Sequence, residues 1–345
     1  MSDAMSYSKA GVNIDLADAT KAAMAESLKT NDARVLNRIG AFASLFDGRF
    51  EGYRHPVLVL KTEEPGSKQK LALAHGRVRS ICYDMVNHLI NDIAVMGARP
   101  LSVQDAIICG RLEKDVVSQM VDAMASACRE QGCTLTGGET SEQPGVLEPG
   151  TYILTSSVVG VVEKDKIVDG SRIAAGDVVL ALASNGLHTN GYSLVRALMA
   201  QRPEILEARV EGESFLEAIL RPHTCYYRAI NGLFDSEGLH GLAHITGGGV
   251  RDNLRRILPA AVDAVIDLGA IRLLPGFRVI RQAGNVPDAD MIRTFNLGAG
   301  LLMVASPRAV DDFRRHLKAL GCESYPVGAV VKGAGEVRLE GQLAW

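Results

Sequence analysis

The chain has 345 residues, of which 47% are hydrophobic and 22% charged, and its formal net charge is −3. This is the composition of an ordinary globular protein, and the length suits two domains better than one compact core. The chain lacks the basic balance that nonspecific nucleic-acid binding needs, and no apolar run approaches the ~18 residues of a membrane span. We therefore expect neither nucleic acid nor a membrane as a partner.

The cysteines and the N-terminus indicate the compartment. The six cysteines are scattered and form no Cys-x-x-Cys pair, so they suggest neither a zinc site nor a disulfide framework. The segment around Asp3 and Lys9 has no apolar stretch of the kind found in a signal peptide. These features predict a cytoplasmic location.

Helices and strands alternate along the chain. In the first half we expect helices at 18–30, 80–97 and 114–131 and strands at 57–60, 101–109, 133–136 and 152–162. In the second half we expect strands at 178–182, 262–266, 299–305 and 325–331 and helices at 191–200, 213–220, 224–236 and 308–319. The polar segment between the halves contains the turn signal Asp169-Gly170, so we place the boundary there, with domains 1–170 and 171–345. The interleaving predicts an α/β or α+β domain twice.

The first candidate site, 62–68 (TEEPGSK), follows the strand at 57–60. A glycine, a hydroxyl and a lysine after a strand suit a phosphate, because backbone N–H groups and an ammonium can converge on it. The carboxylates of Glu63 and Glu64 could instead hold Mg²⁺ on a triphosphate. The residue order is not that of a Walker loop, and on this motif alone an exposed charged turn is the better explanation.

Two further candidates are acidic. Asp92 follows Asn91 in the 80–97 helix, within a wide apolar arc, and a buried carboxylate needs either a metal ion or an ion pair such as one with a core arginine. Both explanations remain open. The other candidate, 137–140 (GGET), follows a short strand, and its glycines allow a sharp turn close to a ligand. Glu139 could bind a metal or act in catalysis there, and a plain turn with a solvated Glu139 explains the four residues equally well.

Two glycine-rich segments lie in the second half. The segment 184–193 (SNGLHTNGYS) joins a strand to a helix, where free N–H groups and the helix dipole favour an anion. A helix cap by Asn190 or Ser193 is the simpler alternative, but the polar run is longer than a cap needs. The segment 244–249 (HITGGG) has three consecutive glycines, whose entropic cost is best explained by close approach to a ligand. The segment 293–298 (RTFNLG) and Asn285 are weak signals on their own.

Together these segments are much more specific than any one of them. They occur in the order and spacing of one known family: Tyr7–Asp15 (YSKAGVNID), Asn91-Asp92, Gly137–Gly145 (GGETSEQPG), Asp169-Gly170-Ser171, Gly186–Arg196 (GLHTNGYSLVR), His244–Gly249 (HITGGG) and Arg293–Gly298 (RTFNLG). Over nearly its whole length the chain resembles phosphoribosylformylglycinamidine cyclo-ligase, also called AIR synthetase.

The resemblance implies a fold and an activity. The fold is the two-domain α/β (α+β) AIR-synthetase-like fold, in which the N-terminal domains of two subunits form a shared β-barrel, with ATP near the dimer interface. The chain would therefore be a homodimer acting on a small-molecule substrate. With ATP and Mg²⁺ it would convert formylglycinamidine ribonucleotide into aminoimidazole ribonucleotide, ADP and phosphate, a step of purine biosynthesis.

The resemblance also implies site residues of four kinds. The expected catalytic residues are Lys9, Lys68, His188 and His244. The expected nucleotide-binding residues are Glu63, Gly66, Ser67, Lys68, Asn91, Asp92, Gly137, Gly138, Glu139 and Thr140. The expected substrate-binding residues are Ser184, Gly186, His188, Thr189, Asn190, Gly191, Thr246, Gly247, Gly248 and Gly249. The expected Mg²⁺ ligands are Glu63, Asp92 and Glu139.

One segment departs from the family. Its usual Asp-Gly-Val-Gly-Thr-Lys loop stands here as Glu63-Glu64-Pro65-Gly66-Ser67-Lys68, in which Pro65 removes a backbone donor. The alternatives are therefore a divergent paralogue that phosphorylates another amide, or a non-catalytic scaffold that binds a nucleotide. The related selenophosphate synthetase uses a reactive cysteine near its N-terminus, whereas the first cysteine here is Cys82. The related hydrogenase-maturation dehydratase uses a C-terminal cysteine, whereas this chain ends Gln-Leu-Ala-Trp. Both differences count against these two activities.

Overall fold

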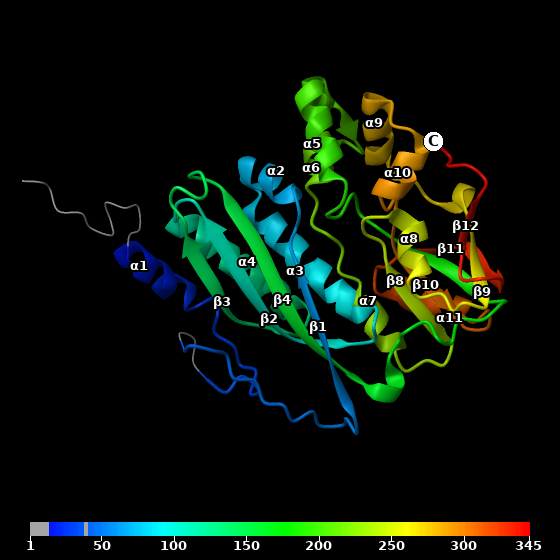
Figure 1. Cartoon of the computed structure of the whole chain (residues 1–345), viewed down its shortest axis with the longest axis horizontal. Coiled ribbons are helices and arrows are strands. Elements are labelled where there is room, and N and C mark those ends of the chain that lie inside the picture. Colours follow the sequence, from blue (N-terminus) through cyan, green and yellow to red (C-terminus); the bar gives the residue numbers. More distant parts are fainter. Residues whose placement is uncertain (1–13, 38–40) are drawn as a thin grey trace, which may run out of the picture. The chain divides into compact units, whose positions relative to one another are not determined.

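The computed structural model describes residues 14–37 and 41–345 and divides the chain into two compact units (Figure 1). The first unit comprises the chain up to Leu89 together with Pro100–Val161, and the second comprises Ile90–Arg99 and Val162–Trp345. The second unit therefore begins earlier than the boundary expected after residue 170. It also includes Ile90–Ala94, the last turn of a helix that begins at Val78 in the first unit.

The first unit is a four-stranded sheet with helices. Its strands, in the order β1-β4-β2-β3, are β1 (Pro56–Glu63), β2 (Arg99–Cys109), β3 (Thr134–Glu142) and β4 (Tyr152–Glu163). Its helices are α1 (Ile14–Met24), α2 (Lys68–Ala74), α3 (Val78–Ala94) and α4 (Lys114–Glu130). The helices α3 and α4 lie along the sheet (Figure 1), and both bury apolar residues completely, among them Met85 and Leu89 of α3 and Met120 and Met124 of α4.

The two faces of this sheet differ. Alternate residues of β2, from Val103 to Ile107, are buried, as expected for a face that is covered by helices. On β1, by contrast, the side chains of Leu58 and Leu60 are 52% and 70% exposed. One face of the sheet therefore presents apolar side chains to solvent within this unit.

The second unit contains a six-stranded sheet in the order β12-β9-β11-β5-β10-β8. The strands are β5 (Val178–Ala183), β8 (Leu239–His244), β9 (Val262–Asp267), β10 (Ala299–Ala305), β11 (Ser324–Lys332) and β12 (Val337–Glu340), and a separate small sheet pairs β6 (Arg209–Val210) with β7 (Glu213–Ser214). The pairs of the large sheet are antiparallel except β9 with β12. Every residue of β10, which pairs with β5 on one side and β8 on the other, is buried.

The helices of this unit are α5 (Tyr192–Gln201), α6 (Phe215–Ile219), α7 (Tyr227–Ile230), α8 (Gly249–Arg255), α9 (Pro275–Gly284), α10 (Asp288–Thr294) and α11 (Val310–Ala319). No helix in the described ranges is long and apolar enough to cross a membrane.

The expected mixture of helices and strands in two domains is confirmed, with local differences. The first expected helix, 18–30, ends at Met24, and the helix expected at 224–236 is only α7 followed by a 3-10 turn. The strand expected at 133–136 continues to Glu142, so the segment 137–140 is part of β3 and not a turn. The elements α2, β8, α9, α10 and β12 were not expected. Most of them are seven residues or shorter, too short for a helical or strand period to be recognised in the sequence.

Candidate functional site

Asn91 and Asp92, in the last turn of α3, both belong to the second unit. The Asn91 amide is fully buried: its oxygen accepts a hydrogen bond from the Tyr226 N–H at 2.8 Å, and its nitrogen donates to the Thr224 carbonyl at 2.8 Å. Asn91 therefore fixes the chain before α7. Asp92 is 18% exposed and lies 2.7 Å from Nδ1 of His244. A histidine is thus one partner of this carboxylate.

His244 belongs to a cluster of three buried histidines. Its Nε2 lies 3.0 Å from Nε2 of His223, and the His223 ring stacks on the ring of His188 with centroids 3.9 Å apart. One ring nitrogen of each histidine lies within 4.8 Å of the others. His188 and His244 were expected as site residues, whereas His223 was not, because its position in the loop after Pro222 matches no motif.

The segment 293–298, which was a weak signal in the sequence, holds the polar loop that follows β5 through hydrogen bonds of Asn296. Asn296 is 2% exposed, and its amide oxygen accepts hydrogen bonds from the Ser184 hydroxyl and the Gly298 N–H. Its amide nitrogen donates to the Gly186 carbonyl at 3.0 Å. The two segments are more than a hundred residues apart, so Asn296 holds in place a loop to which no local pattern connects it.

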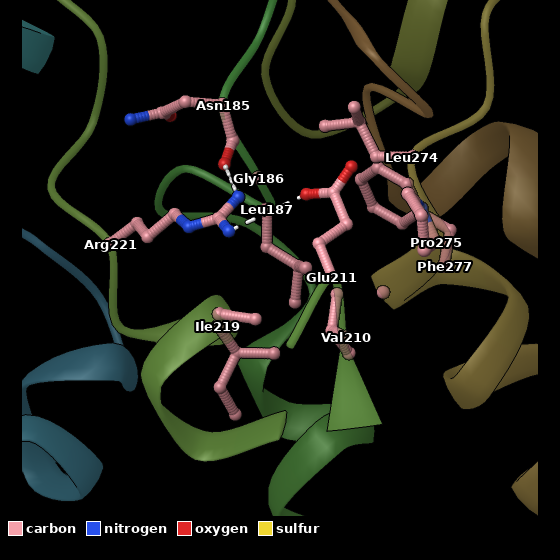
Figure 2. A pocket seen from close by; sticks show the side chains of 12 residues that line it. Asn185, Gly186, Leu187, Val210, Glu211, Ile219, Arg221, Leu274, Pro275 and Phe277 are labelled. Atoms are coloured by element: carbon pink, nitrogen blue, oxygen red, sulfur yellow. Dashed lines mark hydrogen bonds and ion pairs between the residues drawn. The ribbon is translucent and has the colours of Figure 1, made fainter. Parts of the chain in front are cut away.

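Arg221 holds the other side of the same loop. Figure 2 shows its guanidinium between the Asn185 carbonyl and the Glu211 carboxylate, beside a small pocket lined by Leu187, Ile219 and Phe277 among others. Nη1 donates to the Asn185 carbonyl at 3.1 Å, and Nη2 lies 3.5 Å from the Glu211 carboxylate. Arg221 was not expected from the sequence. Its acidic partners, Glu211 and Glu213, lie several residues away, and nothing in the sequence distinguishes this arginine from one in an ordinary surface ion pair.

The helix α5 starts at the end of the polar loop 184–191. Its N-cap residue, Gly191, has a φ of 80° and no side chain of its own with which to cap the helix. A Cβ at position 191 would lie 2.0 Å from the Phe295 ring, so the glycine is also required by packing. Thr189 and His188 are buried just before this helix.

The glycines at 247–249 lie beside the same loop. A Cβ on Gly247 would be 3.6 Å from the Asn190 amide oxygen, and one on Gly249 would be 1.9 Å from the Ile292 carbonyl. The Asn253 amide donates to the carbonyls of Thr246, Gly247 and Gly249, and its oxygen accepts a hydrogen bond from the Thr246 hydroxyl. The second unit thus brings together 184–191, 244–249, 293–298 and Asp92.

In the first unit, Lys68 is not part of an exposed charged turn. It is the first residue of α2, it is fully buried, and its ammonium lies 2.8 Å from the Asp84 carboxylate, which is also fully buried. Burial lowers the pKa of the Lys68 ammonium, and the charge of Asp84 opposes this shift. Gly66 and Ser67 form the turn before α2, and Glu63 ends β1 with its carboxylate 2.8 Å from the Lys61 ammonium.

Glu139 and Thr140 lie on β3, and the Glu139 side chain is exposed. Neighbouring strands are about 4.8 Å apart, so β1 and β3, with two strands between them, are separated by about 14 Å. Glu63 and Glu139 therefore lie on opposite edges of the sheet. Lys9, the remaining predicted residue, lies outside the described residues.

Asp105 of β2 is a further buried acidic residue, and it lies directly beside Gly138 of β3. A Cβ there would lie 2.3 Å from the carboxylate and carbonyl oxygens of Asp105 on β2, so only glycine fits. Burial raises the pKa of the Asp105 carboxyl to about 7. The sequence offered only one signal for Asp105, a charged residue on the buried side of an apolar strand.

Comparisons with known proteins identify the family that the sequence resembles. The AIR synthase related protein N-terminal domain matches residues 53–162, and the corresponding C-terminal domain matches residues 174–340. The phosphoribosylformylglycinamidine cyclo-ligase of Methylobacillus flagellatus is 39% identical over 338 residues, which cover 97% of each chain. That of Burkholderia pseudomallei is 41% identical over 94% of this chain and 93% of its own.

Solved structures show the same fold at low identity. Thiamine-monophosphate kinase from Stenotrophomonas maltophilia superposes with a TM-score of 0.66 at 19% identity, over 96% of this chain and 98% of that one. The E. coli hydrogenase maturation protein HypE has a TM-score of 0.66 at 17% identity, over 94% of both chains. Fold and sequence thus define an AIR synthase related protein with both of its domains. The chain belongs to the phosphoribosylformylglycinamidine cyclo-ligase family.

Proposed function

We propose that this chain closes the imidazole ring of aminoimidazole ribonucleotide, using ATP and formylglycinamidine ribonucleotide. The observation that carries the proposal is the identity of about 40% to cyclo-ligases over nearly the whole chain. The segments that converge in the second unit support it, because they are those by which the sequence resembles this family. A divergent paralogue acting on another amide would need the same ATP chemistry with a different acceptor.

The reaction requires a phosphoryl transfer from ATP and then closure of the ring, and both steps involve charged phosphate groups that the protein must bind. The formyl oxygen, a poor leaving group, attacks the γ-phosphorus of ATP, and the bond to ADP breaks. The amidine nitrogen then attacks the formyl carbon, phosphate leaves, and the nitrogen loses a proton. Alignment and charge stabilisation supply most of the rate in phosphoryl transfer.

In the second unit we assign the substrate to the loops around α5. The N-terminus of α5, where the N-cap residue is a glycine, would offer N–H groups to the ribose phosphate. The glycines at 247–249, held by Asn253, allow the backbone to approach the ligand closely. His188 and His244 border this region and are the candidates for proton transfer, since neutral histidine can accept a proton and its cation can donate one.

The nucleotide is assigned to the predicted residues of the first unit, and Asp92 stays a separate predicted metal ligand in the second unit. Glu63, Asp92 and Glu139 are at least partly accessible carboxylates, the oxygen donors that Mg²⁺ prefers. Mg²⁺ would neutralise charge on the ATP phosphates. Because Glu63 and Glu139 lie on opposite edges of their sheet, we propose that they contact different ions or different parts of the nucleotide.

The proposed function is tested by ADP release. We expect release to require both formylglycinamidine ribonucleotide and Mg²⁺, and we expect the aminoimidazole product to form in equal amount. The control reactions contain ATP with related amides and amidines. Substrate-independent release, or a better response to another amide, would favour the paralogue. Nucleotide binding with no release for any acceptor would favour a scaffold.

We also propose that the chain forms a homodimer through the open face of its first sheet. Leu58 and Leu60 are exposed there, and a hollow of about 290 Å³ is lined by Phe46, Phe50 and Val159. An exposed apolar sheet face of this kind is typical of a surface that another protein covers. A second copy of the same sheet would bury it in a shared barrel, as the family resemblance implies.

Leu60→Glu is expected to convert the dimer to a monomer, because it places a charge on the face that the partner would cover. Sedimentation at micromolar concentration measures this. Leu320→Glu is the matched control, since Leu320 is 54% exposed and lies in the second unit. A parent protein that is an active monomer, or a Leu60→Glu protein that remains a dimer, would contradict the proposed interface.

A further inference from the structure

The loop 184–191, which joins β5 to α5, is fixed at its start by a residue from a distant segment. Asn296 is 2% exposed and lies between α10 and β10. Its amide oxygen accepts a hydrogen bond from the Ser184 hydroxyl at 2.9 Å, and its amide nitrogen donates to the Gly186 carbonyl at 3.0 Å. One buried side chain therefore holds both neighbours of Asn185.

The Asn296 amide is itself held in one orientation. The Gly298 N–H donates to its oxygen at 2.8 Å, and the Gly298 carbonyl accepts a hydrogen bond from the Ser184 N–H at 2.9 Å. A Cβ on Gly298 would lie 2.2 Å from the Arg272 carbonyl, so this close approach requires glycine. Because Gly298 presents a donor and Gly186 presents an acceptor, an amide satisfies both of them and a carboxylate does not.

The rest of the loop depends on such anchors, because its backbone conformation is unusual. His188 has a φ of 60° and Gly191 has a φ of 80°, both in the left-handed region. A non-glycine residue keeps this conformation only where the surrounding structure determines it. On the other side of the loop, Nη1 of Arg221 donates to the Asn185 carbonyl at 3.1 Å (Figure 2). The Arg221 side chain is 32% exposed, so Asn296 is the more deeply buried of the two anchors.

We propose that Asn296 is a positioning residue for the substrate. It acts through Ser184 and Gly186, by holding the loop whose far end presents the N–H groups of α5. The inference rests on the proposed function, which assigns the ribose phosphate to that end of the helix. A shift of about 1 Å in a group that binds the substrate can lower the rate by about 10²-fold, so a loosely held loop would bind the substrate poorly. The nucleotide is assigned to the first unit, so ATP binding should not depend on Asn296.

Asn296→Asp tests this role, because the carboxylate has almost the same shape as the amide. It still accepts hydrogen bonds from Ser184 and Gly298, but it cannot donate to the Gly186 carbonyl and repels it. We expect KM for formylglycinamidine ribonucleotide to rise by at least about 10-fold, whereas KM for ATP should change by less than about threefold. An equal rise in both constants, or no rise in the first, would overturn the inference.

Ile266→Val is the matched control for a loss of stability alone. Ile266 is fully buried in β9, and β11 separates this strand from β5 in the same sheet. Its substitution should lower the melting temperature and leave both KM values unchanged. If Ile266→Val raises KM for the substrate as Asn296→Asp does, the effect is one of general destabilisation and the positioning role is wrong.

A binding experiment separates this inference from the proposed function. Formylglycinamidine ribonucleotide is titrated calorimetrically into each protein without ATP, and the parent should bind it at least about 10-fold more tightly than Asn296→Asp does. A parent that does not bind this substrate overturns the proposed function and the inference with it. A parent that binds it with the same affinity as Asn296→Asp overturns the inference alone. If Asn296→Asp does not fold, Asn296→Ser, which introduces no charge, takes its place with the same expected result.

Discussion

Asp92→Asn is expected to lower the turnover number by about 10²–10⁴-fold while leaving the fold intact. The amide has the same shape as the carboxylate, but it gives His244 no anionic partner and is a poor ligand for Mg²⁺. The measurement is kcat at saturating ATP and substrate, with near-ultraviolet circular dichroism and the melting temperature as checks of folding.

Asp177→Asn is the matched control for this prediction. Asp177 also lies 2.7 Å from a histidine, His240, but none of the predicted segments surrounds it. Its turnover should change by less than about threefold, which corresponds to about 0.7 kcal/mol. A change of less than threefold in Asp92→Asn as well would mean that Asp92 serves neither the metal nor the histidine in catalysis.

Lys68→Ala is expected to lower the free energy of unfolding by about 3–5 kcal/mol, because it leaves the Asp84 carboxylate buried without its cation. Denaturant unfolding measures the change. Lys70→Ala, on the exposed side of the same helix, should change the free energy of unfolding by less than about 0.5 kcal/mol. The double variant Lys68→Met with Asp84→Leu should recover most of the loss, since it removes both charges together.

The same variant separates two roles for Lys68. The sequence suggested that this lysine contacts the ATP phosphates, in which case Lys68→Ala should weaken ATP binding more than substrate binding. The structure gives the ammonium a buried carboxylate partner. A large loss of ATP affinity with little loss of stability would favour the phosphate contact as its main role and contradict the stability prediction.

Several conclusions followed from the sequence by itself. The chain length predicted two domains, the interleaved patterns predicted mixed helices and strands in both, and the fold confirms this. The glycines of 184–193 and 244–249 marked loops where the backbone needs unusual freedom, and Gly191 and Gly249 do adopt positive φ angles. These features are local, so they can be recognised from neighbouring residues. The ordered set of motifs then identified the family, although no single motif was specific.

The tertiary structure alone decided which distant residues meet. Asp84 faces Lys68, Asn296 holds Gly186, and His223 joins His244, and in each pair the partners are far enough apart that no helical or strand period links them. The length of β3 was also decided this way, since the pairing of Gly138 and Glu139 with β2 continues a strand through residues with turn-like composition. Strand pairing and burial act between segments, and a pattern read along one segment does not contain them.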